Sequence, residues 1–368
     1  MLVFLMIAAI PFGNAFRIDT SYTLPPSIQV SGEHGWSEWS FCTVAPEGDR
    51  IALIVPTRHE VVTYELNSGH QSVAVKHTAG AALASHESGE ALEGFDWQTF
   101  VKTVARQGRN PDQVNIPVAV AFDRSGRLMV SDAGNRRLSM FARHGDVVSS
   151  FLFGADEDVP STMRLASHGN ILCANLRLDR KQRLNAGHHC NLYTPSGNHL
   201  LALAYTPSIA FERNLWVGVA ATFDVDTAGT IFQTFTCDPT VHVYDQSGRE
   251  VRSFGASPTW FVGPPVLSPP IFELESPPPS YWTAWTRPIG ITCIDQDRVL
   301  RTSLSNGKVP GVSAPFIIDV FTKDGELVAE GVPSDAWPIG VDRDGAIYFL
   351  TLKGDRLLKT HVRERIVP

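Results

Sequence analysis

The sequence predicts an all-β chain that forms a closed ring of about six four-stranded antiparallel sheets. Three observations support this fold. One hairpin pattern occurs five times, a second hairpin precedes it, and successive copies are about 51 to 52 residues apart, or about 77 where an insertion intervenes, which is typical of propeller blades. The 368 residues are 43% hydrophobic and 19% charged, which allows a large core. The 29 glycines and 25 prolines favour many short strands. The predicted architecture is therefore a six-bladed β-propeller.

The recurring hairpin consists of a strand ending in an aromatic residue, a polar turn with glycine, and a second alternating strand. Alternation buries one face of each strand, and glycine supplies the positive φ that a tight turn needs. The copies begin at Val61, Leu138, Cys190, Val241 and Ile318. Their aromatic residues are Tyr64, Phe141, Tyr193, Tyr244 and Phe321, and their turn glycines are Gly69, Gly145, Gly197, Gly248 and Gly325.

The second hairpin is clearest in the segment IPVAVAFDRSGRLMVSDAGNRRLSMF, from Ile116 to Phe141. An inner strand reaches Asp123, Gly126 turns the chain, and LMVSD runs back. Two such hairpins in series make one four-stranded antiparallel blade. Related fragments begin at Phe223, Arg287 and Trp337.

This segment resembles an NHL repeat, with its proline, its Asp-x-x-Gly turn, its aspartate and its asparagine–arginine elements. The whole chain resembles the bacterial group of exported six-bladed propellers of unassigned activity. The resemblance implies a fold and export, and it implies no particular reaction. The third copy, near Met163, lacks the Asp-x-x-Gly turn.

The repeats set the domain organisation. The last blade has too few residues after Leu350 for four strands, and we expect the segment from Phe16 to Ser31 to supply the missing one. Strands from both ends of the chain would then close the ring and remove its free sheet edges. The prediction is a single propeller domain over residues 16–368. Its blades are expected at roughly 32–80, 114–155, 158–206, 214–256, 286–332 and 336–368.

The N-terminal run MLVFLMIAAIPFGNAF is apolar and ends in small residues at Gly13 and Ala15. This pattern predicts a signal peptide over residues 1–15, without the usual positively charged start. The alternative is a buried first strand. A signal peptide places the protein in the periplasm or outside the cell, and we expect no membrane span beyond it. We also expect a monomer.

Two insertions widen the spacing of the repeats. The first, at about 81–113, contains DWQTFVKTVARQG, in which Asp96 suits a helix N-cap and Gly108 a helix end. We predict one short amphipathic helix packed on the propeller, with a mobile lid as the alternative. The residues that recur at helical spacing are Trp97, Phe100, Val101 and Val104.

The second insertion, at 257–288, has nine prolines, which favour a stiff, extended backbone. We expect Trp260, Trp282 and Trp285 to form a ligand- or partner-binding wall near the channel mouth, with Arg287 adding a charged contact. The alternative is that these indoles pack on the protein's own surface.

The five cysteines form no CxxC pair. Aligning the third blade on the second puts Cys173 and Cys190 on neighbouring strands, where an exported protein would form a disulfide. His188 and His189 lie beside Cys190, but adjacent strand residues point to opposite faces, so we predict no metal site there.

The sequence identifies no catalytic residue, because it contains no GxSxG, HExxH or phosphate-binding loop motif. A net charge of −7 argues against nucleic-acid binding. The favoured function is an exported binding or scaffold propeller that recognises a protein or small-molecule ligand on one face of the ring. The alternative is a propeller hydrolase or lyase with a carboxylate-bound metal on the axial face. The cofactor is unknown, and calcium is expected only under that enzyme alternative.

Overall fold

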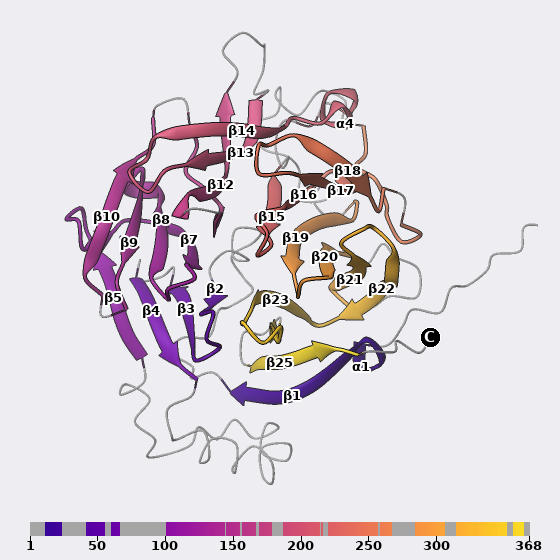
Figure 1. The fold of residues 1–368 in the computed structure, drawn as a ribbon, viewed down its shortest axis with the longest axis horizontal. Helices are drawn as coiled ribbons and strands as arrows, with labels where there is room; N and C mark the ends of the chain where they lie inside the picture. Colours follow the sequence, from indigo (N-terminus) through magenta and orange to yellow (C-terminus); the bar gives the residue numbers. More distant parts are fainter. Residues whose placement is uncertain are drawn as a thin grey trace, which may run out of the picture.

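The protein is a six-bladed β-propeller, in which six sheets surround a central axis (Figure 1); all their strand pairs are antiparallel except the short parallel pair β5–β6 of blade 1. This confirms the fold class predicted from the repeats. The computed structural model describes residues 12–23, 42–55, 60–66, 101–143, 145–154, 157–166, 169–178, 187–213, 215, 220–256, 258–266, 284–305, 314–351 and 356–363.

The first five blades each consist of strands consecutive in sequence, with the innermost strand first. Blade 1 has β2 Cys42–Val44, β3 Arg50–Val55, β4 Glu60–Glu65, β5 Val101–Gln107 and the short β6 Gln113–Val114. Blade 2 has β7 Pro117–Phe122, β8 Leu128–Asp132, β9 Arg137–Phe141 and β10 Val147–Leu152, with a 3-10 turn Ala133–Asn135. Blade 3 has β11 Thr162–Leu165, β12 Ile171–Leu178, β13 Gly187–Tyr193 and β14 His199–Tyr205. Blade 4 has β15 Ala221–Val225, β16 Ile231–Phe235, β17 Asp238–Tyr244 and β18 Glu250–Phe254. Blade 5 has β19 Arg287–Cys293, β20 Arg298–Leu304, β21 Phe316–Thr322 and β22 Leu327–Ser334.

Blade 6 joins the two ends of the chain. Its strands β23 Ala336–Val341, β24 Ile347–Thr351 and β25 Arg356–Val362 are completed by β1 Phe16–Thr23. β1 pairs antiparallel with β25, from Phe16 opposite Val362 to Thr23 opposite Arg356. The expectation that an N-terminal strand closes the ring is therefore confirmed.

The hydrophobic core is divided among the interfaces between blades. Inner strands of successive blades contact one another around the ring. Because strand side chains alternate, each sheet offers one face to the preceding blade and the other to the next. Phe223 of blade 4 thus shares a buried cluster with Leu172 of blade 3, and Ile347 of blade 6 shares one with Leu300 of blade 5. The hydrophobic clusters therefore lie between the blades, and a different set of side chains lines the central axis.

The turn glycines adopt the backbone conformation predicted for them. Gly197 and Gly325 have φ of +87° and +95°, a region that L side chains rarely adopt. They also lie against the neighbouring blade, since a Cβ on Gly197 would be 2.5 Å from Phe151 Cγ. In the inner hairpin of blade 2, Gly126 has φ +77° and the Asp123 carboxylate accepts a backbone N–H from Arg127 at 2.9 Å.

The predicted helix in the first insertion is wrong for the part that the structure describes. Val101–Gln107 form β5, which pairs with β4 through Val62 opposite Thr103 and Tyr64 opposite Val101. The exposed edge of β4 supplies backbone partners that outweigh the helical spacing, and β-branched residues tolerate the extended form. Asp96, Trp97 and Phe100 lie outside the described residues. Two short α-helices are described, α1 Phe12–Ala15 and α4 Ser208–Glu212.

The predicted disulfide is absent, although Cys173 and Cys190 do lie on the neighbouring strands β12 and β13. Both are buried free thiols. Cys173 is opposite Asn191, while Cys190 is opposite Ala174, one position further along the strand. Since directly opposite residues share a face and successive residues alternate, the two sulfur atoms point to opposite faces of the sheet. Cys173 packs toward blade 2 and Cys190 toward blade 4.

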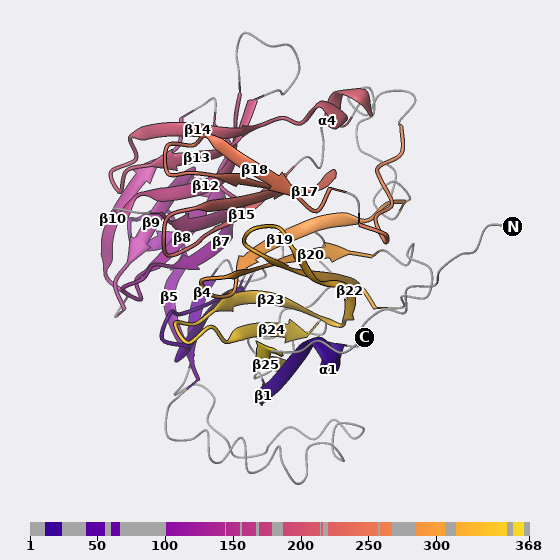
Figure 2. The ribbon, with the colours of Figure 1, turned by 45° about the vertical axis from the view of Figure 1, so that its right-hand side comes forward.

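The ring has two distinct faces (Figure 2). Each inner strand begins at the face where one blade connects to the next, which we name the connection face. The Asp-x-x-Gly turns, including 123–126, 226–229 and 342–345, lie at the opposite face, which we name the turn face. The second insertion, joining β18 to β19, therefore leaves and returns at the connection face. Within the described residues, no helix is long and apolar enough to span a membrane.

Candidate functional site

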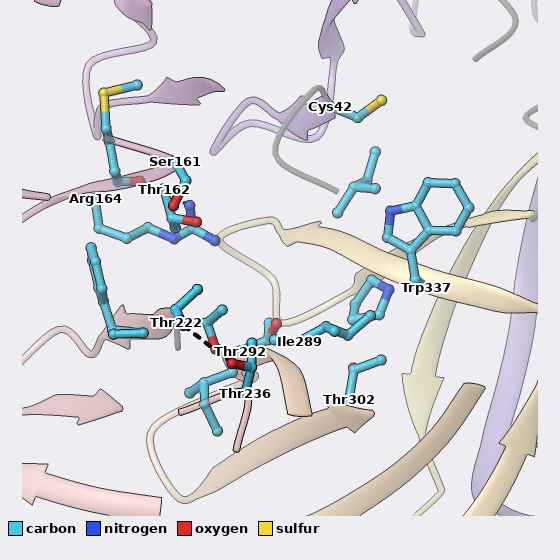
Figure 3. A pocket seen from close by; sticks show the side chains of 18 of the residues that line it. Cys42, Ser161, Thr162, Arg164, Thr222, Thr236, Ile289, Thr292, Thr302 and Trp337 are labelled. Carbon is cyan, nitrogen blue, oxygen red and sulfur yellow. Dashed lines mark hydrogen bonds between the residues drawn. The ribbon is translucent and has the colours of Figure 1, made fainter. Parts of the chain in front are cut away.

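The inner strands enclose a cavity of about 260 Å³ on the propeller axis, which we name the axial cavity. All six blades contribute to it. Most of its lining comes from the inner strands β2, β7, β11, β15, β19 and β23 or the residues beside them, and Thr236 and Thr302 come from the second strands of blades 4 and 5 or the residue beside them. Figure 3 shows Arg164 of blade 3 and Trp337 of blade 6 approaching it from opposite sides, with threonines between them.

Hydroxyl groups form much of the polar part of this lining. Thr222 Oγ1 and Thr302 Oγ1 are buried and make no hydrogen bond with any described residue. A buried hydroxyl without a partner costs about 1–3 kcal/mol, and such groups in a cavity are available to a bound molecule. The other hydroxyl residues of the lining are Ser161, Thr162, Thr236 and Thr292.

Arg164 is held in place at the cavity wall by two fixed contacts. Its Nε donates to Asp224 Oδ1 at 2.9 Å, and its Nη1 donates to the carbonyl of Met163 at 2.9 Å. Asp224 is oriented in turn by the backbone N–H of Cys293, which donates to Oδ2 at 2.9 Å. The pair links blades 3, 4 and 5 across the channel and fixes the direction of the guanidinium group.

Arg287 is the one predicted site residue that the structure places at a cavity. It begins β19, lines the axial cavity and is only 3% exposed. Its guanidinium lies over the ring of Trp285, 5.6 Å from the ring centre. Trp285 itself is buried in the core between blades 3 and 4. It therefore orients Arg287 and offers no free indole surface. Trp282 lies outside the described residues.

Trp260 is a core residue, which corrects its predicted place in a binding wall. It is 5% exposed, packs on Ile317, and donates from Nε1 to Asp319 Oδ1 at 3.0 Å. The Arg301 guanidinium lies 5.4 Å from the centre of its ring. The Asp319 carboxylate of blade 5 therefore accepts the indole N–H, and the role of Trp260 is to pack in the protein's own core.

A second cavity, of about 430 Å³, opens at the turn face. Two arginines narrow its mouth by reaching from blade to blade. Arg124 of blade 2 donates to the carbonyl of Asp226 in blade 4 at 3.3 Å. Arg343 of blade 6 donates to the carbonyl of Arg124 at 2.7 Å and pairs with Glu47 at 3.0 Å.

Several carboxylates around this second cavity are already used by the fold. Asp226 pairs with Lys323 at 2.8 Å, and its Oδ1 accepts the backbone N–H of Thr230. Asp342 pairs with Lys359 at 2.9 Å. Burial alone would lower the pKa of Lys359, but its hydrogen bonds to Asp342 and Tyr348 raise it above the usual value, so the pair stays charged.

No group of three or more His, Cys, Asp or Glu side chains in the described part of the chain is arranged to hold a metal ion. His189 Nε2 hydrogen-bonds with Thr206 Oγ1 at 3.0 Å, and its ring packs edge-on against Phe235. Burial, together with the neighbouring His188, lowers the pKa of His189 to about 4. His189 is therefore a neutral imidazole that packs in the core.

The sequence did not point to Arg164, Asp224 or Thr222 as site residues. Arg164 and Asp224 are 60 positions apart, and only closure of the ring brings them together. One signal was present: Arg164 is a charge within a strand that the repeat places at the axis. An arginine there needs either a buried partner or a ligand.

The protein is thus a six-bladed propeller with a cavity of about 260 Å³ on its axis. The chain resembles a solved member of the DUF4221 family from Bacteroides vulgatus at 12% identity, covering 95% of this chain and 98% of that one, with a TM-score of 0.58. It resembles a Bacteroides fragilis protein thought to be exported at 8% identity, with 96% and 97% covered and a TM-score of 0.61. A streptogramin B lyase structure aligns at 11% identity over 95% and 98%, with a TM-score of 0.47. No family model and no curated protein sequence matches the chain.

Proposed function

We propose that this protein is an exported ligand-binding propeller and that its ligand occupies the axial cavity. The observation that carries the proposal is the lining itself: side chains from all six blades converge there, including two arginines and two unsatisfied hydroxyls. Concave, partly apolar sites with a few fixed polar groups are typical of small-molecule binding. Binding fits better than metal-dependent hydrolysis or elimination, because Asp224, Asp226 and Asp342 near the cavities are each paired with lysine or arginine.

Export is supported by two observations. The apolar run over residues 1–15 ends in small residues at Gly13 and Ala15, as a signal peptide does, and the ring-closing strand β1 begins after it at Phe16. The Bacteroides fragilis protein of the same fold is thought to be exported. N-terminal sequencing of the protein from a bacterial periplasmic fraction should begin at Phe16. An intact N-terminus confined to the cytoplasm would contradict export. The proline, the Asp-x-x-Gly turn and the Asn-x-Arg element of blade 2 also support an NHL-type repeat.

Occupancy of the axial cavity can be tested by filling it. Thr222→Trp places an indole in the cavity, while Ser253→Trp adds the same group to the exposed strand β18 of the same blade. Benzoate, benzamide and benzamidine serve as ring probes in ligand-observed NMR titrations. We expect at least one probe to bind wild type and Ser253→Trp but not folded Thr222→Trp. Equal binding to all three proteins, or no binding of any probe, would overturn the proposal.

A further inference from the structure

Thr302 reaches the axial cavity although it belongs to β20, the second strand of blade 5. The inner strand β19 lies between β20 and the axis, and its residue opposite Thr302 is Gly290. Because Gly290 has no side chain, it leaves a gap in the wall, and Thr302 lines the cavity at that gap (Figure 3). The φ of Gly290 is not positive, so the backbone there does not require glycine. What the glycine provides is the gap.

The hydroxyl of Thr302 is buried without a hydrogen-bonding role in the described structure. The residue is 1% exposed, and its Oγ1 makes no hydrogen bond with any described residue. Thr222 Oγ1, on the inner strand of the neighbouring blade 4, is in the same condition. A valine has the same shape and leaves no polar group unsatisfied, so threonine is the less stable choice for the fold alone. Both hydroxyls are therefore available to a molecule bound in the cavity.

The charges of the lining favour a neutral ligand. Arg164 is already compensated by Asp224, at 2.9 Å. Arg287 is also engaged, with its guanidinium carbon 5.6 Å from the centre of the Trp285 ring. The lining contains no aspartate or glutamate that would hold a cation. Because an ion brought into a buried site costs free energy unless a counterion compensates for it, a neutral molecule loses least on entering this cavity.

The rest of the lining sets the size and the apolar part of the ligand. Trp337, Phe223 and Ile289 give the cavity apolar surfaces. Since a water takes about 30 Å³ of liquid volume, the cavity of about 260 Å³ has room for roughly nine waters. This volume suits a molecule about as large as a benzene ring with a single small substituent.

We propose that the axial cavity binds a small neutral molecule through a group that both donates and accepts hydrogen bonds, such as a carboxamide. This group contacts the Thr302 hydroxyl at the gap left by Gly290, and the apolar body of the ligand lies against Trp337. A threonine hydroxyl donates and accepts at once, so it complements such a group. The inference rests on the proposed function and adds the class of ligand and the contact that selects it.

The test of the ligand class compares three ring probes of nearly identical shape and different charge. Benzamide is neutral, benzoate is an anion and benzamidine is a cation. In NMR titrations of the full chain, benzamide is expected to bind at least about tenfold more tightly than either ion. For a ligand this small, dissociation constants in the millimolar range are expected. Benzoate or benzamidine binding as tightly as benzamide would overturn the neutral-ligand proposal while leaving a binding cavity in place. If no probe binds, both proposals fail.

Two variants test the contact at Thr302. Gly290→Ala closes the gap with a Cβ that would lie 3.7 Å from Thr302 Cβ, an ordinary van der Waals contact. We expect benzamide to bind at least about fivefold more weakly while the midpoint of urea unfolding stays at or above that of wild type. Thr302→Val is expected to weaken binding by a similar factor and to raise the midpoint, because it removes an unsatisfied buried hydroxyl.

Ser303→Ala is the matched control for both variants. Ser303 is the next residue of β20, is 0% exposed, and its Oγ makes no hydrogen bond with any described residue. It points to the opposite face of the strand and does not line the axial cavity, so benzamide binding should be unchanged. Wild-type affinity in folded Gly290→Ala and Thr302→Val would refute the contact. A lower unfolding midpoint for Thr302→Val would show that its hydroxyl serves the fold, which also counts against the proposal.

Discussion

The ion pair between Arg301 and Asp319 is deeply buried, and we expect it to have a large effect on stability. Their side chains are 1% and 0% exposed, with Nη2 and Oδ2 2.8 Å apart. Asp319 Oδ1 also accepts the Trp260 Nε1–H at 3.0 Å and the Gly331 N–H at 2.8 Å. Arg301 donates to the carbonyls of Pro239 and Gly255, which ties blade 5 to blade 4.

Asp319→Asn removes the negative charge and leaves the guanidinium buried without its counterion. Breaking a buried pair from one side costs about 3–5 kcal/mol, so we expect a loss of that size in the free energy of unfolding. Urea unfolding followed by tryptophan fluorescence and by far-ultraviolet circular dichroism measures it, provided the two transitions coincide.

Two further variants show whether the lost charge is the cause. Asp295→Asn is the matched control, since Asp295 pairs with Arg298 at 2.6 Å but both side chains are about 30% exposed. Such pairs contribute about 0–1 kcal/mol. The double variant Arg301→Met/Asp319→Leu should be more stable than Asp319→Asn, because no charge remains buried. A loss below about 1 kcal/mol for Asp319→Asn, or one equal to the control, would refute this reasoning.

Three other predictions concern the turns, the buried imidazole and the thiols. Gly325→Ala should cost at least about 2 kcal/mol of unfolding free energy in urea titrations, because φ is +95° and a Cβ would lie 2.8 Å from Phe254 Cβ; wild-type stability would contradict this. His189 has its pKa lowered to about 4 by burial, so the unfolded state binds the extra proton first and stability falls as pH drops from about 6.5 to 4. By pH 5 the loss from this residue should be about 2 kcal/mol, and His189→Gln should lack it; an equal pH dependence in both proteins would rule it out. Burial raises the pKa of the Cys173 and Cys190 thiols, so both should be unreactive toward a thiol reagent in the folded protein and react once it is unfolded. If the protein is unfolded without reductant and two fewer thiols react than the five cysteines predict, the two residues form a disulfide.

The repeat made the architecture predictable because each blade is specified locally. The aromatic residue, the polar turn and the glycine of each hairpin lie within about a dozen residues, where alternation and turn chemistry act directly. The closing strand was also predictable, since the last blade lacked one strand after Leu350. The segment at Val101 was misread because its apolar spacing fits a helix as well as a strand. Pairing with β4, which decides between them, is set by residues about 40 positions earlier.

The aromatic residues of the second insertion show a different limit. A run of prolines and tryptophans is typical both of a binding loop and of a segment sealed against its own fold. The difference for Trp260 is the Asp319 carboxylate, 59 positions away, which accepts its indole N–H. Composition alone does not reveal such a partner. Arg287 lay at the site because it begins an inner strand, whereas Arg164 gave little signal in a blade without the Asp-x-x-Gly turn.

The division of labour within the ring explains why the axis is the place to look for function. Hydrophobic packing in this fold lies between neighbouring blades, and at the turn face the carboxylates of Asp226 and Asp342 form ion pairs with lysines. Side chains of the inner strands that face the axis contribute little to either task, so an apolar filling there would stabilise the ring at least as well. Burying a guanidinium group costs free energy unless something compensates for it. At the axis, Asp224 compensates Arg164, whereas the buried hydroxyls of Thr222 and Thr302 make no hydrogen bond with any described residue, so the axial cavity is where polar groups of the described structure remain available to a bound molecule.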